Sequence, residues 1–232
     1  MDLFDYMREN ALRQEAPLAV RMRPQSLEEI AGQAHILGKD KLLYRAVKAD
    51  AVGSMILYGP PGCGKTTIAE VISRETQSDF CRLNATTAGK KEMEEVIQRA
   101  KENFGRGRRT TLFVDEIHRF HKGQQDFLLP YVEDGTIALI GATTENPFFE
   151  VNAALLSRSR IFELKPLAAA DIAALLRRAM ADKERGYGNW SAELTEEACA
   201  FLADAAAGDA RTALNALELG MKTTAPESDG CI

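Results

Sequence analysis

A glycine-rich segment, Gly59-Pro60-Pro61-Gly62-Cys63-Gly64-Lys65-Thr66, constrains the fold of this chain more than any other feature. It follows the apolar run at 55–58 and precedes the helix-like run at 67–72, so the predicted order is strand, loop and helix. Glycines let a backbone fold tightly around phosphate oxygens, and the N–H groups at a helix N-terminus attract anions. The segment therefore predicts a binding site for a nucleoside triphosphate.

The loop has an expected contact for each part of the bound nucleotide. Lys65 is expected on the β- and γ-phosphates, and the Thr66 hydroxyl is expected to ligate Mg²⁺. An ordinary glycine-rich turn is the alternative, and the flanking strand and helix argue against it. The predicted nucleotide-binding set comprises Gly59, Pro60, Pro61, Gly62, Cys63, Gly64, Lys65, Thr66 and Thr67.

Charge and composition exclude several classes of protein. The 232 residues carry a formal net charge of −5, which argues against a protein that coats nucleic acid by bulk charge. No apolar run approaches the roughly 20 residues that span a bilayer, so no membrane partner is expected. The acidic N-terminus lacks the pattern of a signal peptide. Four scattered cysteines without metal-ligand spacing favour a reducing cytoplasm.

A local basic cluster remains despite the acidic balance. It consists of Arg99, Lys101, Arg106, Arg108 and Arg109. These side chains could contact nucleic acid, and the alternative is a solvated loop before a strand.

Apolar runs typical of strands alternate with runs of helical periodicity. The expected strands span 54–58, 79–83, 110–114, 137–142 and 160–164, with helices at 65–77, 89–104 and 123–134. Continuous apolar strands separated by helices predict a parallel sheet covered on both faces. We therefore expect an α/β fold with a five-stranded parallel sheet sandwiched by helices. Ligands bind such sheets at the carboxyl ends of the strands.

The pattern changes after Pro166 and indicates a second domain. Residues after this point lack strand-like runs, and helices are expected at about 168–185, 194–206 and 209–222. The predicted organisation is a leader at 1–17, a P-loop ATPase domain at 18–165, a helical lid domain at 166–222 and a tail at 223–232. The tail ends without a closing element, which favours a fragment of a longer protein.

Two acids follow the apolar run at 111–114. Asp115 is expected to hold Mg²⁺ through water, and Glu116 to orient and deprotonate the attacking water. This second acid favours hydrolysis by water over phosphoryl transfer to a metabolite. Thr144, after the strand at 137–142, could contact the γ-phosphate or the water, although polar residues commonly follow strands.

Arginines outside the loop are candidates for stabilising the transferred phosphoryl group. Arg158 precedes the last strand, and its position far along the sheet indicates delivery to a neighbour's site. Arg160 competes with it for this role. Arg211, at the start of the third helix of the small domain, could reach the γ-phosphate. The alternative for Arg158 and Arg160 is a surface position on a loop.

The order of these motifs resembles that of the AAA+ ATPases. Four segments are similar to the replication-associated recombination protein A family, in the clamp-loader branch: 115–120 (DEIHRF), 124–126 (QQD), 133–136 (EDGT) and 141–147 (GATTENP). Residues 19–24, with Gly32-Gln33, resemble the N-terminal segment of that branch. The resemblance covers roughly residues 15–222.

The resemblance implies a role for each matching residue. Lys65 and Thr66 match the Walker A motif, and Asp115 and Glu116 match Walker B. The other implied roles are sensor 1 for Thr144, the trans-acting arginine finger for Arg158, sensor 2 for Arg211, a glutamate-restraining position for Asn84, and flanking of the adenine for Val20 and Arg21. Cys63 would be a small neutral filler rather than a redox-sensitive group.

The resemblance also implies a function and partners. It implies ATP and Mg²⁺ as cofactors and DNA-dependent ATP hydrolysis at stalled replication forks or gaps, in a cytoplasmic, nucleoid-associated protein. Single-strand-binding protein is an implied partner, and members continue beyond residue 232 with a domain that drives tetramer formation. Met1-Asp2-Leu3-Phe4 resembles peptides that dock on a sliding clamp, although a disordered leader is favoured. The alternative function is a clamp-loader-like, ATP-switched protein-binding subunit. A small-molecule kinase is disfavoured by Glu116 and the lid.

Overall fold

The computed structural model describes residues 16–224 of the chain. They divide into a larger unit, Gln25–Lys165, and a helical unit formed by the described parts of Met1–Pro24 and Pro166–Ile232. The Met1-Asp2-Leu3-Phe4 segment, most of the predicted leader and nearly all of the predicted tail lie outside the described residues.

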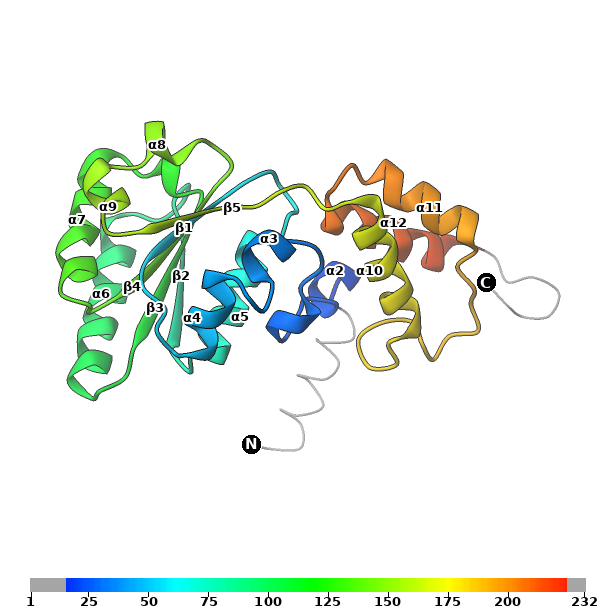
Figure 1. Cartoon of the computed structure of the whole chain (residues 1–232), viewed down its shortest axis with the longest axis horizontal. Helices are drawn as coiled ribbons and strands as arrows, with labels where there is room; N and C mark the ends of the chain where they lie inside the picture. Colours follow the sequence, from blue (N-terminus) through cyan, green and yellow to red (C-terminus); the bar gives the residue numbers. More distant parts are fainter. Residues whose placement is uncertain (1–15, 225–232) are drawn as a thin grey trace. The chain divides into compact units, whose positions relative to one another are not determined.

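A five-stranded parallel sheet forms the centre of the larger unit (Figure 1). Its strands are β1 (Met55–Tyr58), β2 (Asp79–Asn84), β3 (Thr110–Asp115), β4 (Ala138–Thr143) and β5 (Arg160–Glu163). Their order across the sheet is β2-β3-β4-β1-β5, and every pair is parallel. The predicted five-stranded parallel sheet is therefore confirmed, with each strand boundary within one residue of its expected place.

Helices surround this sheet in both predicted and unpredicted places. In chain order they are η1 (Leu27–Glu29), α3 (Ala34–Leu37), α4 (Leu42–Lys48), α5 (Lys65–Glu75), α6 (Lys90–Gly105), η2 (Ile117–Arg119), α7 (Lys122–Glu133), α8 (Pro147–Glu150) and α9 (Ala153–Leu156). The predicted helices correspond to α5, α6 and α7. The short helices before β1 and after β4 were not predicted, because one or two turns give too few residues for a periodic pattern.

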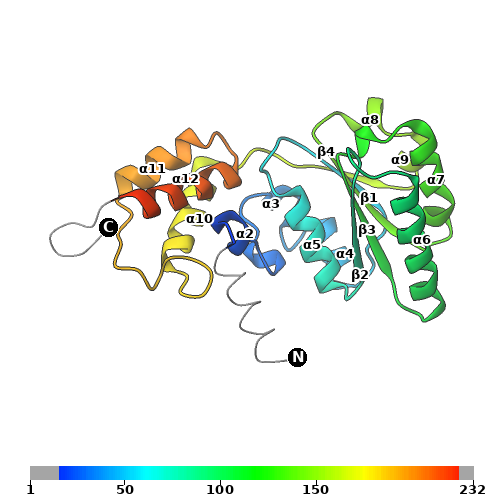
Figure 2. The ribbon, with the colours of Figure 1, turned by 180° about the vertical axis from the view of Figure 1, so that it is seen from behind.

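Alternating side chains of the strands divide the core into two layers. Successive strand residues point to opposite faces. Ile56 and Leu112 pack with α6, α7 and α9 on one face, whereas Leu57, Phe113 and Ile140 pack with α4 and α5 on the other. Figure 2 shows the two groups of helices on opposite sides of the strands. Both faces of the central strands are thus buried, which explains their continuous apolar sequence.

The helical unit contains α2 (Leu18–Arg21), α10 (Ala169–Ala181), α11 (Glu196–Ala205) and α12 (Ala210–Thr223). The first predicted lid helix was expected to reach residue 185, but it ends at Ala181. Asp182 stops it, because its Oδ1 accepts the backbone N–H groups of Glu184 and Arg185 at 2.9 and 2.8 Å. Gly186 then passes so close to α10 that a Cβ would lie 1.9 Å from the Ala179 carbonyl oxygen.

Residues 18–24 belong to the helical unit, which differs from the sequence-based domain 18–165. Leu18 and Met22, four residues apart, are buried in the core of the helical unit. The Leu18 backbone N–H also donates to Glu218 Oε2 in α12 at 2.9 Å. This short segment resembles a domain start in sequence, but its apolar positions are buried against α10 and α12.

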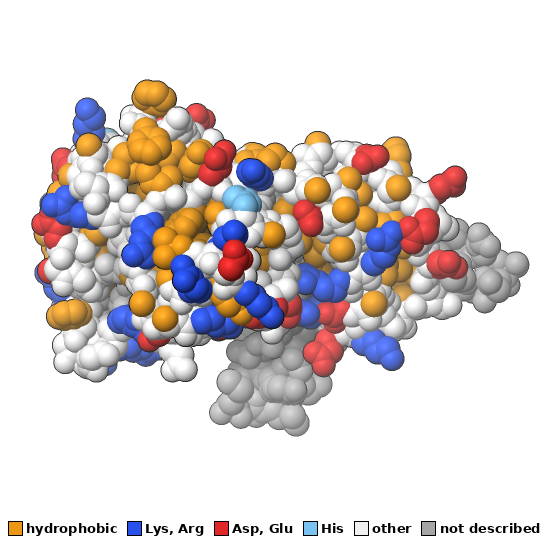
Figure 3. Space-filling view, in the orientation of Figure 1, with side chains coloured by type: hydrophobic (Ala, Val, Ile, Leu, Met, Phe, Trp, Pro, Cys, Tyr) orange, Lys and Arg blue, Asp and Glu red, His pale blue; other side chains and the backbone are white. Residues whose placement is uncertain are grey.

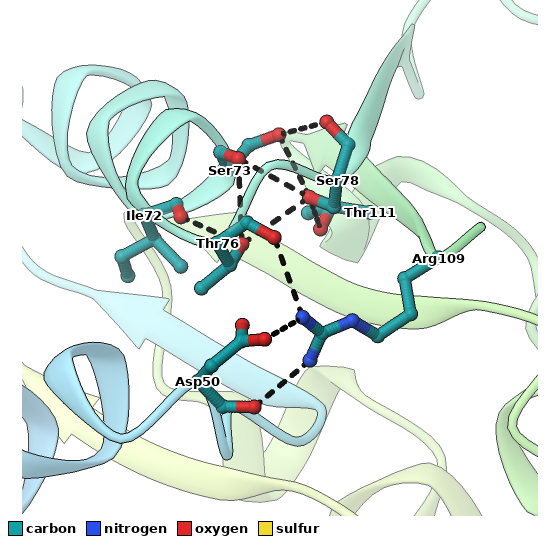
Figure 4. Close-up of polar contacts among 7 residues, drawn as sticks. All are labelled: Asp50, Ile72, Ser73, Thr76, Ser78, Arg109 and Thr111. Atoms are coloured by element: carbon teal, nitrogen blue, oxygen red, sulfur yellow. Dashed lines mark hydrogen bonds and ion pairs between the residues drawn. The ribbon is translucent and has the colours of Figure 1, made fainter. Parts of the chain in front are cut away.

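Hydroxyl groups connect the end of α5 to the sheet (Figure 4). Thr76 Oγ1 donates to the Ile72 carbonyl at 2.8 Å. Ser78 Oγ lies 2.9 Å from Ser73 Oγ and 2.7 Å from Thr111 Oγ1. These buried or half-buried groups therefore satisfy one another, as buried polar groups must.

Most side chains of the basic cluster contact other residues of the same chain. Arg109 donates to the carboxylate and carbonyl of Asp50 (Figure 4). Arg99 Nε and Nη2 donate to the Asp79 carboxylate at 2.6 and 2.5 Å. Lys101 Nζ lies 4.9 Å from the centre of the Tyr131 ring. These contacts favour a structural role for three of the five cationic side chains. Among residues 16–224, no helix is long and apolar enough to cross a bilayer.

Asp79 should supply a pH-dependent part of the stability. Burial raises the pKa of its carboxyl, but hydrogen bonds from Arg99 and Asn103 outweigh burial and hold the pKa below its usual value. Because the folded-state pKa is below the unfolded one, the contribution is full above about pH 4 and is lost as the pH falls further. Asp79→Asn should lower the free energy of unfolding by about 1–2 kcal/mol at pH 7 and by less at pH 3. Urea unfolding at both pH values measures this.

The matched control is Asp204→Asn, which changes an exposed carboxylate. It should leave the unfolding curve unchanged at both pH values. Equal destabilisation by Asp79→Asn at pH 7 and pH 3 would contradict the assigned role of its carboxylate charge.

Candidate nucleotide site

The glycine-rich loop joins β1 to α5 at the carboxyl edge of the sheet. Gly62 and Gly64 have φ angles of 69° and 102°, in the left-handed region that glycine tolerates best. Gly64 directly precedes α5, which begins at Lys65. The first N–H groups of α5 lack partners within the helix and are available to a phosphate.

Lys65 folds back over this loop. Its side chain is largely buried, and Nζ donates to the carbonyl oxygens of Gly59 at 2.7 Å and Pro60 at 2.8 Å. The ammonium group is therefore positioned at the loop itself. Phosphate oxygens bind an ammonium more strongly than neutral carbonyls do, so a nucleotide can compete for it.

Gln33 connects the glycine-rich loop to the segment that follows β5. Its side chain is buried, and Nε2 donates to the carbonyl oxygens of Lys165 at 2.7 Å and Cys63 at 3.4 Å. Its Oε1 accepts the Lys165 backbone N–H at 3.1 Å. The sequence showed Gln33 only as part of a family segment and gave no sign of this bridge. Cys63 is buried in the core beneath the loop, as a small filler would be.

Asp115 ends β3 and offers an oxygen ligand for a cation. Its carboxylate and the Thr66 hydroxyl are hard donors of the kind that Mg²⁺ prefers. In the part of the chain that the structure describes, no three His, Cys, Asp or Glu side chains cluster to hold a metal. The residues present therefore fit an ion that takes its other ligands from phosphate and water, as Mg²⁺ does with nucleotides.

Arg82 is a neighbour of Asp115 that was not predicted from the sequence. Its Nη2 lies 2.8 Å from Asp115 Oδ2, and its guanidinium lies 5.8 Å from the centre of the Phe113 ring. Residues 82 and 115 are far apart in sequence, and only the pairing of β2 with β3 brings them together. A cation at Asp115 must share the carboxylate with Arg82 or displace it.

Glu116 follows Asp115 in an unusual backbone conformation. Its φ and ψ are 55° and 44°, which is uncommon for a residue other than glycine and occurs often at functional sites. Its Oε2 lies 3.4 Å from Nε2 of His118. Asn84 Oδ1 accepts hydrogen bonds from the backbone N–H and hydroxyl of Thr86, and the expected restraint of Glu116 by Asn84 stays a prediction.

The polar end of β4 contains one buried and one exposed threonine. Thr144 is exposed, as a residue facing a ligand could be, and its role as sensor 1 stays a prediction. Thr143 is fully buried, and its Oγ1 lies 2.8 Å from His118 Nδ1. Neither Thr143 nor His118 was predicted as a site residue, although both lie beside predicted ones.

Arg158 and Arg160 lie near the amino-terminal ends of the parallel strands, away from the loop of their own chain. Arg160 begins β5 and is paired with Met55, the first residue of β1. The four residues of β1 separate these strand ends from the loop by about 10 Å. Arg158 Nη2 lies 2.5 Å from Glu133 Oε1. This placement favours delivery of either arginine to another subunit.

The remaining candidates lie in the helical unit. Arg211 is exposed near the start of α12, where Asp209 Oδ1 accepts its backbone N–H at 2.7 Å. Val20 is exposed. Arg21 donates to the Arg185 carbonyl at 2.7 Å and lies over the Tyr187 ring. The nucleotide-related roles of Val20, Arg21 and Arg211 stay predictions.

Gly59 should be essential to the loop. A Cβ at this position would lie 2.3 Å from the Leu164 carbonyl oxygen, which is backbone and cannot move aside easily. Gly59→Ala should therefore destabilise the protein by about 1–3 kcal/mol and weaken nucleotide binding. Thermal unfolding and titration with a fluorescent ATP analogue measure the two effects.

Gly53→Ala is the matched control, because a Cβ at this position would meet nothing within 4 Å beyond its chain neighbours. It should keep both the unfolding temperature and the affinity. Equal behaviour of the two variants would contradict the close approach at Gly59.

The chain is similar to known ATPases. Residues 55–167 match the ATPase family associated with various cellular activities (AAA). Replication-associated recombination protein A of Escherichia coli K12 is 55% identical over 203 residues, which are 88% of this chain and 45% of the relative. The protein of the same name from Bacillus subtilis 168 is 49% identical over 92% of this chain and 50% of the relative. The chain spans about half the length of these relatives.

Solved structures support the same fold. The Holliday junction branch migration motor RuvB of Thermotoga maritima superposes with a TM-score of 0.69 at 27% identity, over 87% of this chain and 66% of that chain. The predicted AAA fold is thus confirmed, and such a fold implies nucleotide binding with Mg²⁺. Over the length that it spans, the chain belongs to the replication-associated recombination protein A family of AAA ATPases.

Proposed function

We propose that this chain is the ATPase part of a DNA-dependent AAA+ enzyme that acts at stalled replication forks or gaps. The observation that carries the proposal is the meeting of the glycine-rich loop, Asp115 and Glu116 at one edge of the sheet. The names of the relatives support the setting in replication-associated recombination. ATP and Mg²⁺ are the proposed cofactors, and the proposed location is cytoplasmic and nucleoid-associated.

The proposed reaction is hydrolysis of ATP to ADP and phosphate. Lys65 and the N–H groups of the loop bind the β- and γ-phosphates, and Thr66 and Asp115 provide the ligands for Mg²⁺. Glu116 orients the water and accepts its proton. Thr144 contacts the γ-phosphate or the water. Arg211 senses the nucleotide from the helical unit, and Val20 and Arg21 flank the adenine.

The proposed partners follow from the relatives. DNA is supported by the names that refer to recombination and to Holliday junction branch migration. A homo-oligomer is supported by the position of Arg158 at the opposite edge of the sheet from the loop. The proposed tetramer and the proposed contact with single-strand-binding protein rest on the family resemblance alone.

The experiment is a steady-state ATPase assay at low salt with forked, gapped and blunt duplex DNA. Forked or gapped DNA should raise turnover several-fold, and blunt duplex should raise it less. Glu116→Gln should bind the nucleotide normally and lower kcat by about 100-fold or more, since the phosphate contacts remain and the base is removed. Both this chain and a form with the full length of the relatives are assayed. Turnover that no DNA changes in either form contradicts the proposal.

Arg158 should act across subunits. Arg158→Ala should lower turnover in the assembled state by about 10³-fold, the usual worth of an arginine finger. Mixing it with a Lys65→Ala variant should restore activity, because each supplies what the other lacks. Arg160→Ala should keep most of its turnover. A flat mixing curve removes the trans assignment, and loss in Arg160→Ala alone transfers it to Arg160.

One observation favours the alternative, an ATP-switched protein-binding subunit. Phe148 and Phe149 in α8 are 66% and 84% exposed. Figure 3 shows hydrophobic side chains gathered over α8. Adjacent exposed aromatic rings are typical of protein contacts. Pull-down of the sliding clamp and single-strand-binding protein by wild type, but not by Phe148→Ser/Phe149→Ser, supports this function over the first.

A further inference from the structure

A buried imidazole lies beside the proposed catalytic carboxylate, and the reaction described above does not use it. His118 is in η2, and its side chain is only 7% exposed. Its Nε2 lies 3.4 Å from Glu116 Oε2, and its Nδ1 lies 2.8 Å from Thr143 Oγ1. The imidazole therefore bridges the acidic end of β3 and the end of β4.

The partners of the imidazole determine which nitrogen carries the proton. Thr143 Oγ1 accepts the backbone N–H of Glu145 at 3.0 Å, and its own proton needs an acceptor. His118 Nδ1, at 2.8 Å, is nearer than the Glu145 carbonyl oxygen at 3.4 Å. We therefore assign the Thr143 hydroxyl as the donor to Nδ1, which places the proton of a neutral imidazole on Nε2. The nearest charged group to Nε2 is the Glu116 carboxylate, with its Oε2 3.4 Å away, and an ionised carboxylate can only accept.

Thr143 also holds the beginning of the phosphate loop. Its carbonyl oxygen accepts the Gly59 backbone N–H at 3.1 Å. It pairs with Tyr58 in the register of β1 with β4 and is fully buried. The same residue therefore fixes the loop through its backbone and the imidazole through its hydroxyl.

We propose that His118 is a positioning residue which, together with Thr143, aims the Glu116 carboxylate at the attacking water. The inference rests on the proposed hydrolysis at Glu116. The left-handed backbone of Glu116 is strained for a residue other than glycine, so surrounding contacts must maintain it. At metal sites, removing a group that orients a ligand costs about 10- to 100-fold in affinity or activity, and we expect a loss of the same order for the carboxylate of Glu116.

A purely structural imidazole predicts different behaviour. Such a group would only satisfy buried polar atoms, and its loss would lower stability and nucleotide affinity. A positioning imidazole changes kcat and leaves KM for ATP nearly constant, because it acts on the carboxylate and not on the phosphates.

The test compares His118→Phe, His118→Gln and Thr143→Val. His118→Phe should lower kcat by about 10- to 100-fold with KM for ATP within about twofold of wild type. His118→Gln should recover part of the loss, because its amide can donate to Glu116. Thr143→Val should also lower kcat. In a Glu116→Gln background, His118→Phe should add no further loss, since the group that it orients is gone.

His121→Asn is the matched control. His121 is exposed, and its ring nitrogen caps α7 by accepting the Gln124 backbone N–H at 3.2 Å. Asparagine is also a good N-cap, so this variant should behave as wild type.

Two results overturn the inference while the proposed function stands. One is a kcat of His118→Phe within about twofold of wild type. The other is a loss of nucleotide affinity and thermal stability in both His118 variants that accounts for their lost turnover.

A readout without turnover separates the two proposals. If neither this chain nor the form with the full length of the relatives hydrolyses ATP, the proposed function fails, and ¹⁵N NMR of the His118 ring still tests the geometry. The Nε2–H tautomer, with ring shifts that change in Glu116→Gln and Thr143→Val, supports it. The Nδ1–H tautomer, or ring shifts that neither substitution changes, overturns it.

Discussion

The parallel pairing of β1 with β4 is the constraint on which the candidate site depends. Its register places Tyr58 beside Thr143, so both strands end at the same level. β3 pairs with the other side of β4 and ends at Asp115. Loop, acids and threonines therefore meet because parallel strands put their carboxyl ends at one edge. A shift of one residue in this register would turn every buried side chain of β1 to the other face.

Secondary structure was predicted best where a run of several residues carries the same apolar or glycine pattern. β1, β3 and β4 are buried on both faces, so their continuous apolar runs identified them. The loop identified the phosphate site because its glycines meet a specific backbone requirement. The end of α10 was misplaced, because Asp182 stops the helix through its own side-chain hydrogen bonds. Residues 18–24 were misplaced because their partners lie about 150 or more positions further along the chain.

The partners of the catalytic groups were not predictable in the same way. Arg82 of β2 contacts Asp115 of the neighbouring strand β3, and Gln33 contacts the loop from a segment outside the sheet. Such pairs depend on tertiary distance, and no local pattern in the sequence reports it. His118 is different, since it lies two residues after Glu116 in a single turn. Its position was visible, but its role required knowing that Thr143 is buried behind it.

Three charged groups of the candidate site already have partners within the chain. Lys65 donates to two loop carbonyls, Asp115 accepts from Arg82, and Arg158 pairs with Glu133. Binding of a nucleotide, a cation or a neighbouring subunit is therefore an exchange of partners. The net free energy of such an exchange is the small difference between two sets of hydrogen bonds. Internal partners of this kind keep the groups ordered and lower their entropy cost on binding. They also make affinity depend on residues that never touch the ligand, of which Arg82 and Glu133 are examples.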